Sequence, residues 1–315
     1  MKRILVVRND RLGDLMLILP ALRLIKSSIP NITIDCLADD NYKELETLSP
    51  YIDNIISKNE LNTKISKEKY ECSISFFATF PVAYMLWIGG IKKRYAPLTK
   101  LAQIFFNKKI KQIRSESIKP EYQYNNDLAN FFINDNGYTV KDSESPLVTI
   151  EHNKSIEAKG KKIIFLHPYT GGSSKTLSDE DFLKLCKSLQ ELCDCKFILH
   201  CDHSDYEKCR IIENSSNSLD IQTIKPTNNL REMFNNIKQC DLFIAGSTGP
   251  LHVAAAMNKK TVGFYPSKKS STALRWDTMN NHNRKLFFTD TGRDKYNLTI
   301  NISETAKVIF EKLLS

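Results

Sequence analysis

The length, composition and charge of the chain exclude several classes of protein. Its 315 residues include 41% hydrophobic and 26% charged residues with only 11 Gly and 11 Pro, which excludes a disordered or fibrous protein. Because single domains usually have about 100–200 residues, we expect two domains. The net charge of +9 favours anionic partners. No basic run alternates with aromatic residues, so we expect phosphorylated substrates or an anionic lipid surface and no nucleic acid.

The eight cysteines predict buried thiols rather than disulfide bonds or a metal site. The first residues have a strand pattern instead of a signal-peptide pattern, so we expect a cytoplasmic protein with reduced thiols. Five cysteines lie between Cys186 and Cys209, with His200 and His203 nearby, but they lack the paired C-x₂-C spacing of a structural zinc site. We therefore expect no bound metal and small core residues at these positions.

The first half of the chain alternates strand and helix patterns. Residues 3–7, RILVV, form an apolar run of the kind found in parallel strands that are covered on both faces. We expect a turn at residues 14–18 and a helix at residues 20–27, because Pro20 fits the first turn of a helix but not its interior. Further strands are expected at residues 31–38, 52–57 and 70–77, and further helices at residues 41–49 and 81–88.

Residues 72–91 carry no charge and just reach the length of a membrane span. Pro81 and the pair Gly89 and Gly90 divide this run, and the alternation of strands and helices requires one element of each kind here. We therefore expect a buried strand followed by a buried helix, and no helix that crosses a membrane.

After Gly137 the sequence becomes polar and irregular, and the alternation begins again at residue 162. We expect domains at residues 1–155 and 156–302, and a terminal helix at residues 303–315 that packs back across the boundary. Strands are expected at residues 162–168, 195–201, 219–224, 241–247 and 260–266, and helices at residues 177–192, 204–216, 229–240 and 249–258. This alternation predicts an α/β fold with two doubly wound, Rossmann-like parallel sheets that face a cleft.

Two turns rich in small residues are candidate phosphate sites. The strand at residues 241–247 ends at Ser247, Thr248 and Gly249, and Pro250 opens a helix whose first N–H groups and dipole favour an anion. An ordinary strand-to-helix turn explains the same residues equally well, because no G-x-G-x-x-G or Walker pattern is present.

The second of these turns follows the strand at residues 162–168. Its lysine, Lys175, lies just before a helix that we expect Ser178 to cap, and a surface charge is the alternative role for this lysine. Its small polar residues are Thr170, Gly171, Gly172, Ser173 and Ser174.

The stretch RNDRLGDLM contains two aspartates directly after the first strand. Gly13 is expected at a sharp turn, and Asp14 follows it near a helix start. A carboxylate at a strand end that faces a cleft is well placed as a general base, and a helix cap is the equally good alternative.

Four segments in the same order resemble the glycosyltransferase family 9 enzymes, the heptosyltransferases of lipopolysaccharide core synthesis. The segments are ILVVRNDRLGDLMLILPAL, FLHPYTGGSSKTLSDEDFLKL, LREMFNNIKQCDLFIAG and LFIAGSTGPLHVAAAMNKKTVGFYP. The resemblance implies a glycosyltransferase-B architecture, with an N-terminal acceptor-binding domain and a C-terminal domain that binds a nucleotide-sugar, usually ADP-heptose. It also implies inverting transfer without a metal or other cofactor. Residues 107–150 carry no mark of the family.

The resemblance assigns roles to individual residues. Asp14 matches the catalytic base, which removes the proton from the acceptor hydroxyl as that oxygen attacks the anomeric carbon. Lys175 matches the lysine that binds the donor phosphates, and Thr170 and Gly171 are assigned to the same donor site. The diphosphate-binding helix start is matched by Thr248, Gly249, Pro250, Leu251 and His252, preceded by Ser247.

Two positions within these segments have open roles. Many members of the family have an aspartate where this chain has Ser247, so the donor sugar is either held differently or not the usual heptose. His252 either faces the phosphates or packs in the core.

The remaining residues of the first site are expected to support the loop or the acceptor. We expect Asp10 to hold the loop through Arg8 or Arg11, with Gly13 beside them. Two carboxylates so close together would raise the pKa of one of them unless the arginines compensate.

The sequence therefore predicts an inverting heptosyltransferase that acts on a lipid-linked, phosphorylated glycan. We expect it to lie in the cytoplasm, peripheral to the anionic inner membrane of a bacterium. The alternatives are a transferase of the same fold that uses another nucleotide-sugar for capsule or another surface glycan, and a non-catalytic protein that binds nucleotide or glycan. A nicotinamide-dependent oxidoreductase is disfavoured, because NDRLGD lacks the glycine fingerprint.

Overall fold

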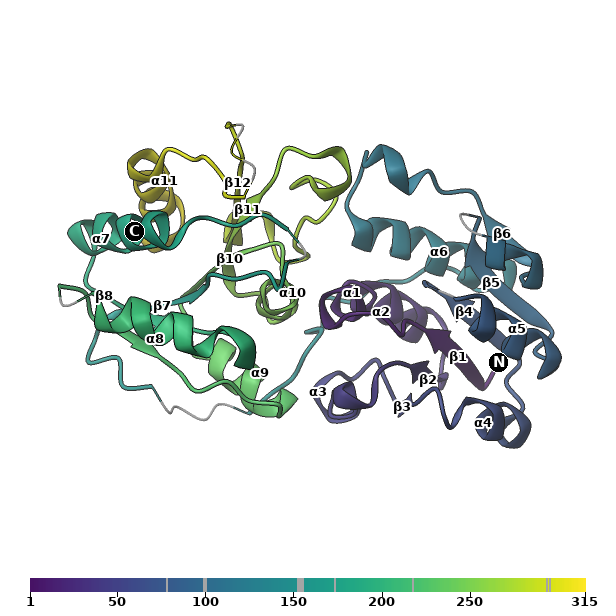
Figure 1. Ribbon diagram of the computed structural model, residues 1–315. Coiled ribbons are helices and arrows are strands. Elements are labelled where there is room, and N and C mark those ends of the chain that lie inside the picture. The colour runs from purple at the N-terminus through teal and green to yellow at the C-terminus, as the bar shows by residue number, and fades with distance from the viewer. Residues whose placement is uncertain are drawn as a thin grey trace. The chain divides into compact units, whose positions relative to one another are not determined.

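A computed structural model describes residues 1–77, 79–98, 101–151, 156–172, 174–216, 218–292, 294 and 296–315. The chain divides into two compact units, Met1–Thr149 and Ile150–Ser315 (Figure 1). Each unit is built on one six-stranded sheet, and every strand pair in both sheets is parallel. The predicted α/β class with two doubly wound sheets is confirmed.

The first sheet has the strand order β3-β2-β1-β4-β5-β6. Its strands are β1 (Arg3–Val7), β2 (Thr33–Leu37), β3 (Asn54–Ile56), β4 (Cys72–Ser75), β5 (Lys93–Pro97) and β6 (Lys108–Ile110). Strand β1 lies in the middle and is buried from Ile4 to Val7, which explains its uninterrupted apolar sequence.

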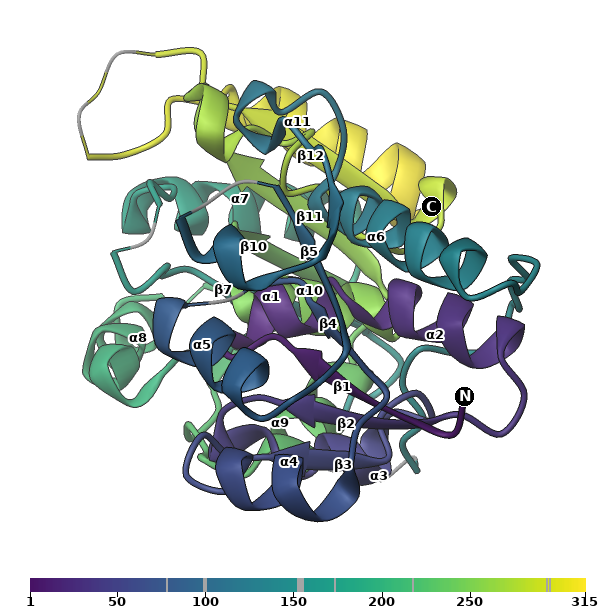
Figure 2. The ribbon, with the colours of Figure 1, turned by 90° about the vertical axis from the view of Figure 1, so that its right-hand side faces the viewer.

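Helices cover both faces of the first sheet. They are α1 (Leu12–Met16), α2 (Leu19–Ser28), α3 (Leu45–Leu48), α4 (Leu61–Glu68), α5 (Phe80–Ile88) and α6 (Glu121–Asp135), with the short 3₁₀ segments η1 (Asp40–Tyr42), η2 (Leu101–Phe105) and η3 (Arg114–Glu116). Helices α2 and α6 pack together on one face, whereas α4 and α5 cover the face that carries Leu5 and Val7 (Figure 2).

The second sheet has the strand order β12-β11-β10-β7-β8-β9. Its strands are β7 (Lys162–His167), β8 (Cys195–Leu199), β9 (Ile221–Thr223), β10 (Leu242–Gly246), β11 (Lys260–Tyr265) and β12 (Lys285–Thr289). Its helices are α7 (Asp179–Leu192), α8 (Tyr206–Asn214), α9 (Leu230–Lys238), α10 (Gly249–Ala256) and α11 (Ile302–Ile309), with a π-helical turn at Phe310–Leu314 and 3₁₀ segments η4 (His203–Asp205), η5 (Lys269–Ser271) and η6 (His282–Arg284).

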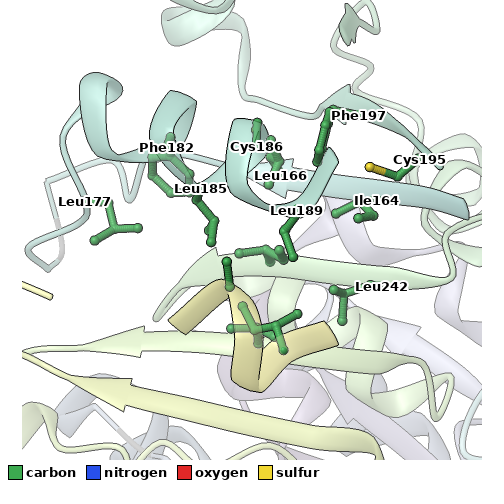
Figure 3. Close-up of a cluster of buried hydrophobic side chains, with 14 of the residues drawn as sticks. Ile164, Leu166, Leu177, Phe182, Leu185, Cys186, Leu189, Cys195, Phe197 and Leu242 are labelled. Atoms are coloured by element: carbon green, nitrogen blue, oxygen red, sulfur yellow. The ribbon is translucent and has the colours of Figure 1, made fainter. Parts of the chain in front are cut away.

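The core of the second unit lies between the sheet and helices α7 and α11. Figure 3 shows Phe182, Leu185 and Leu189 of α7 gathered in one cluster with Ile164 and Leu166 of β7. The buried residues of the terminal helix belong to the same cluster; they are Ile302, Ala306, Ile309, Leu313 and Leu314. The terminal helix therefore contributes its apolar face to the second unit, and its packing on the first domain stays a prediction.

Two local expectations are wrong. The expected turn at residues 14–18 is instead the short helix α1, which already begins at Leu12. Gly13 is the second residue of this helix and is not among the described residues with a positive φ, so no sharp turn occurs there. An apolar turn of helix packs better against the sheet than an open turn would, because Leu15 and Met16 are both fully buried.

The uncharged stretch at residues 72–91 forms β4 and α5, and Ala78 between them lies outside the described residues. The strand is buried as predicted, but the prediction of a buried helix is wrong for one face of α5. Phe80, Tyr84, Trp87 and Ile88 are exposed, because only the opposite face packs on the sheet. None of the helices in the described ranges is long and apolar enough to span a bilayer.

Candidate functional site

The first candidate site is a charge cluster directly after β1. Arg8 is only 4% exposed, and its guanidinium lies between two carboxylates. Its Nε atom lies 2.9 Å from Oδ1 of Asp10, and its Nη2 donates a hydrogen bond of 2.5 Å to Oδ1 of Asp14. The buried cation therefore fixes both aspartates at the carboxyl end of the central strand.

Asp14 is the third residue of α1, but it does not cap this helix. The N-cap residue is Arg11, and no side chain supplies a capping hydrogen bond. The Asp14 carboxylate accepts a hydrogen bond from Arg8 instead. Arg11 is exposed and forms no ion pair with an acid of the described chain, so Arg8 alone of the two arginines holds Asp10.

The two aspartates differ in their electrostatic surroundings. Burial raises the pKa of Asp10 to about 6, and the nearby charge of Arg8 opposes this while that of Asp14 adds to it. The sequence left open whether the arginines compensate, and the structure shows a raised pKa at Asp10, to which burial contributes more than the charge of Asp14. Asp10 is mostly ionised at neutral pH and takes up a proton in mildly acidic solution.

Residues from α6 surround Arg8 on its other side. Oε1 of Glu121, whose side chain is almost fully buried, lies 4.0 Å from Nη1 of Arg8 and accepts a hydrogen bond from Arg114. Asn125 accepts a longer bond from Arg114 and donates one of 3.0 Å to the carbonyl of Leu17, which follows α1. No local pattern in the sequence signals the contacts to Arg8 and Leu17, because these partners lie more than 100 positions from α6 in the chain.

The second candidate site begins where β10 ends. Thr248 is the N-cap residue of α10 in extended conformation, and Pro250 lies in the first turn, as predicted. No side chain caps this helix, so the first N–H groups have no partner within it. Oγ1 of Thr248 and Nδ1 of His252 are buried and lack a hydrogen-bond partner among the described residues. A ligand with several oxygen atoms would satisfy such groups.

His252 supplies no positive charge to this site. It is buried within α10, and burial lowers its pKa to about 4. The imidazole is therefore neutral at neutral pH. The structure favours the packing role, in which His252 contributes a neutral polar atom at most.

The turn after β7 lies beside the turn after β10. Strands β7 and β10 are neighbours, and a Cβ atom added to Gly246 would lie only 3.0 Å from Cγ2 of Thr170. Gly171 and Gly172 have φ angles of +57° and +76°, which favour glycine. Ser173 lies outside the described residues. The structure thus brings the two predicted turns together.

Internal hydrogen bonds hold the turn after β7 in shape. Thr170 donates a bond of 2.6 Å to the carbonyl of Ser174, and Thr176 donates one of 2.7 Å to the carbonyl of Pro168. Ser178 caps α7 as predicted and accepts a bond from the N–H of Asp181.

Lys175 is tethered rather than loose on the surface. Its Nζ lies 3.4 Å from Oδ2 of Asp290 and also donates to the carbonyl of Asp294. Burial would raise the pKa of Asp290, but the N–H groups of Thr299 and Gly292 together with Lys175 hold that pKa below its usual range. Asp290 follows β12, and sequence reasoning missed it because nothing near it marks a partner for Lys175.

The cysteine cluster is part of the core. Seven of the eight cysteines are buried, and Cys193 is half-buried. Across the described ranges, no group of three or more His, Cys, Asp or Glu residues is placed to hold a metal ion.

The fold and the two sites define a class of protein. The structure is similar to that of Escherichia coli ADP-heptose lps heptosyltransferase II, with a TM-score of 0.79 and 17% sequence identity over 100% of this chain and 99% of that one. Two parallel six-stranded sheets of this kind form the glycosyltransferase-B fold. The protein therefore has the glycosyltransferase-B fold.

Sequence comparison places the chain within this class. Residues 59–291 match the family model described as Glycosyltransferase family 9 (heptosyltransferase), and the chain belongs to that family. A Haemophilus influenzae protein whose name assigns it to the glycosyltransferases is 34% identical over 309 residues, covering 91% of this chain and 89% of the relative. Lipooligosaccharide heptosyltransferase 2 of Campylobacter jejuni is 26% identical over 291 residues, covering 89% and 84%. The family predicted from the four segments is confirmed.

Proposed function

We propose that the protein transfers a heptose from ADP-heptose to the core of a lipopolysaccharide or lipooligosaccharide, with inversion at the anomeric carbon. The observation that carries this proposal is the pairing of Asp14 with buried Arg8 at the end of the central strand of the first sheet. The names of two similar proteins support the substrate class, since one contains ADP-heptose and the other lipooligosaccharide.

Asp14 acts as the general base in this proposal. Its Oδ1 accepts a hydrogen bond from Arg8, and its Oδ2 forms no hydrogen bond with the described residues. Oδ2 takes the proton of the acceptor hydroxyl while the hydroxyl oxygen attacks the anomeric carbon. The bond from that carbon to the diphosphate breaks at the same time, and ADP leaves with the electron pair. Arg8 remains protonated and keeps the carboxylate in place for the attack.

The donor diphosphate binds at the start of α10 and the neighbouring turn. The free N–H groups of α10 and its dipole attract the phosphates, and the unpartnered hydroxyl of Thr248 donates to them. Lys175 adds a positive charge from the adjacent turn. The left-handed backbone at Gly171 lets the phosphates approach closely, and Thr170 lies at the contact between the two turns.

The residues beside these groups shape both sites. Gly249, Pro250 and Leu251 form the first turn of α10. We assign Ser247, which stands where many members of the family have an aspartate, to the donor sugar. In the first unit Asp10 and Gly13 hold the loop, while exposed Arg11 is available to acceptor phosphates. No metal or cofactor takes part in this scheme.

The acceptor is a lipid-linked, phosphorylated glycan at the cytoplasmic face of a bacterial inner membrane. The net charge of +9 suits such an acceptor and an anionic lipid surface. Ser247 favours one second candidate, a transfer of another sugar from another nucleotide to a different surface glycan.

Calorimetric titration with ADP, GDP and UDP tests the donor assignment. We expect ADP to bind most tightly, because ADP-heptose is the proposed donor. A preference for GDP or UDP would support the second candidate, and failure of all three nucleotides to bind would contradict the transferase proposal.

A further inference from the structure

Helix α5 is apolar on every side, yet only one of its faces is covered. Val82, Ala83 and Leu86 are fully buried in the core of the first unit. The side chains on the outer face, namely Phe80, Tyr84, Trp87 and Ile88, are between 44% and 57% exposed. A helix that is apolar all round is usually covered all round, so the outer face of α5 lacks its cover in the isolated chain.

The exposed side chains form one packed surface with η2. The ring of Phe105 lies at its centre, with ring-centroid distances of 5.0 Å to Phe80, 5.6 Å to Tyr84 and 5.7 Å to Trp87. Ile104, which is 69% exposed, extends this surface from η2. We call these residues the aromatic patch: Phe80, Tyr84, Trp87, Ile88, Ile104 and Phe105.

The positive charge of the chain is concentrated around the aromatic patch. Residues 79–119 contain nine Lys and Arg but a single acid, Glu116, so they carry +8 of the net charge of +9. All other residues together are nearly neutral. Lys108, Arg114 and Lys119 form ion pairs with acids outside the segment, and the other six cations carry the excess positive charge of this part of the chain.

One of these lysines, Lys109, lies on the same side of the sheet as α5. Lys109 of β6 is paired in register with Ala96 of β5, which belongs to the core beneath α5. Paired residues of parallel strands point to the same face, so Lys109 points to the side of the aromatic patch. Lys108 points to the opposite side, where it pairs with Asp135 at 2.8 Å.

Three lysines of this segment are not neutralised by the described residues. Lys92, Lys109 and Lys111 are exposed and form no ion pair with an acid in the described part of the chain. Unpaired lysines around exposed Trp and Tyr side chains are the composition of a surface that binds at a membrane interface.

We propose that the aromatic patch docks the protein on an anionic lipid bilayer. Trp87 and Tyr84 would lie at the level of the headgroups, with the lysines toward the lipid phosphates. The nine residues of α5 are far fewer than the roughly 20 needed to cross a bilayer, so the helix would lie in the plane of the interface.

Other occupants fit the patch less well. Protein interfaces are depleted in lysine, and a second copy of the chain would bring two strongly positive segments together. The rings pack edge to face or tilted around Phe105, which leaves few open ring faces for nucleic-acid bases to stack on.

The position of the aromatic patch also concerns the acceptor of the proposed transferase, and this one inference rests on the proposed function. Helix α5 follows β4, and Phe76 at the end of β4 donates a hydrogen bond of 3.0 Å to the carbonyl of Val7, next to Arg8. Helix α5 thus begins at the carboxyl end of the sheet, where Asp14 also lies. A bilayer bound at α5 would bring the sugar of a lipid-linked acceptor toward this end of the sheet.

Flotation of the full chain with lipid vesicles tests the docking directly. We expect binding to vesicles of phosphatidylglycerol and phosphatidylethanolamine at low salt, and little binding to phosphatidylcholine. The double variants Phe80→Ser with Trp87→Ser and Lys109→Glu with Lys111→Glu should each bind about tenfold more weakly. Matched controls in the second unit are Ile211→Ser, at a residue that is 67% exposed, and Lys187→Glu with Lys307→Glu.

Tryptophan fluorescence locates the contact, because the chain has only two tryptophans, Trp87 and Trp276. In the Trp276→Phe variant, we expect anionic vesicles to shift the emission of Trp87 to the blue and brominated lipids to quench it. Unchanged emission in the presence of bound vesicles would overturn the assignment of the patch.

The remaining outcomes separate this proposal from the transferase proposal. Wild-type protein that does not float with anionic vesicles, or patch variants that float like wild type, would overturn the docking proposal. So would a dimer or an oligonucleotide complex that the Phe80→Ser and Trp87→Ser variant abolishes. Patch variants that no longer bind vesicles but still bind ADP would support the docking proposal. Wild-type protein that binds vesicles but no nucleotide would contradict only the transferase function.

Discussion

The two sheets share one strand order, but the sites at their carboxyl ends are built in opposite ways. In each sheet the two middle strands, β1 with β4 and β7 with β10, mark the point at which the strand order reverses. Ligands of doubly wound folds bind beside this point. After β1 the protein fills the position with its own charges, because Arg8 binds Asp10 and Asp14. After β10 it leaves Oγ1 of Thr248 and Nδ1 of His252 without a hydrogen-bond partner among the described residues.

This difference fits a division of labour between the sites. A base must be held in one geometry before the substrate arrives, so its surroundings are completed by the protein. A phosphate site must exchange its partner in each turnover, so its donors are left free or, as with Lys175, only lightly tethered. Removal of Arg8 from the first site should therefore lower stability, whereas variants of the second site should lower the affinity for the nucleotide.

The largest effect is expected from Arg8→Met. Removal of the buried guanidinium leaves Asp10 and Asp14 without their cation, and we expect the free energy of unfolding to fall by about 3–5 kcal/mol. Urea denaturation measures this loss. Arg11→Met is the control, since Arg11 is exposed and should change stability by less than about 0.5 kcal/mol. Equal losses of stability in the two variants would contradict the claim that buried Arg8 holds the first site together.

Lys175→Ala should weaken donor binding with little loss of stability. A charge-assisted contact to phosphate is worth about 1.5–3 kcal/mol, so we expect the affinity for ADP to fall about tenfold to a hundredfold. Asp290 retains its two backbone hydrogen bonds, which limits the structural damage. Calorimetry with ADP checks this prediction, with Lys187→Ala of α7 as the control. Unchanged affinity would remove Lys175 from the donor site.

Asp10→Asn should stabilise the protein at neutral pH. The pKa of Asp10 is raised to about 6, so the folded state binds this proton more tightly than the unfolded chain, and stability falls as the pH rises through this range. The variant removes that penalty, which is about 1–3 kcal/mol above pH 7. Urea denaturation from pH 4 to pH 8 should show the gain at high pH and its disappearance near pH 4. A gain that grows toward low pH would contradict this account.

The smallest effect is expected from Thr248→Val. The hydroxyl of Thr248 has no hydrogen-bond partner in the part of the chain that the structure describes, so its loss should change the free energy of unfolding by less than about 0.5 kcal/mol. A hydrogen bond to the diphosphate would be lost, and the affinity for ADP should fall about fivefold. Calorimetry and urea denaturation of the same sample measure both quantities. Loss of stability without loss of affinity would show a structural role for this hydroxyl.

The sequence predicts the central strands and most of the helices, but it misses strands β5, β6 and β12. Strands buried on both faces are continuous apolar runs, as at β1 and β10, and such runs are easy to recognise. Strand β6, with the sequence KKI, and strand β12 are edge strands whose exposed or charged residues hide their pairing. The exposed face of α5 was missed because the sequence of an apolar helix does not distinguish a face covered by the protein's own core from a face covered by an outside partner.

The candidate sites were predicted only as far as local patterns reach. The turn before α10 and the cap at Ser178 depend on neighbouring residues, and both were found. The choice between Arg8 and Arg11 depends on which side chain enters the core, and both are the same residue type. Glu121 and Asp290 reach their partners only through the tertiary fold.

Single-turnover transfer by Asp14→Asn tests the central claim most directly. The amide is nearly isosteric and still accepts the bond from Arg8, but it cannot take the proton of the acceptor. With ADP-heptose and a truncated core acceptor, we predict a rate about 10²–10⁴-fold below wild type with unchanged affinity for ADP. Transfer by Asp14→Asn within about threefold of the wild-type rate would contradict the assignment of Asp14 as the base.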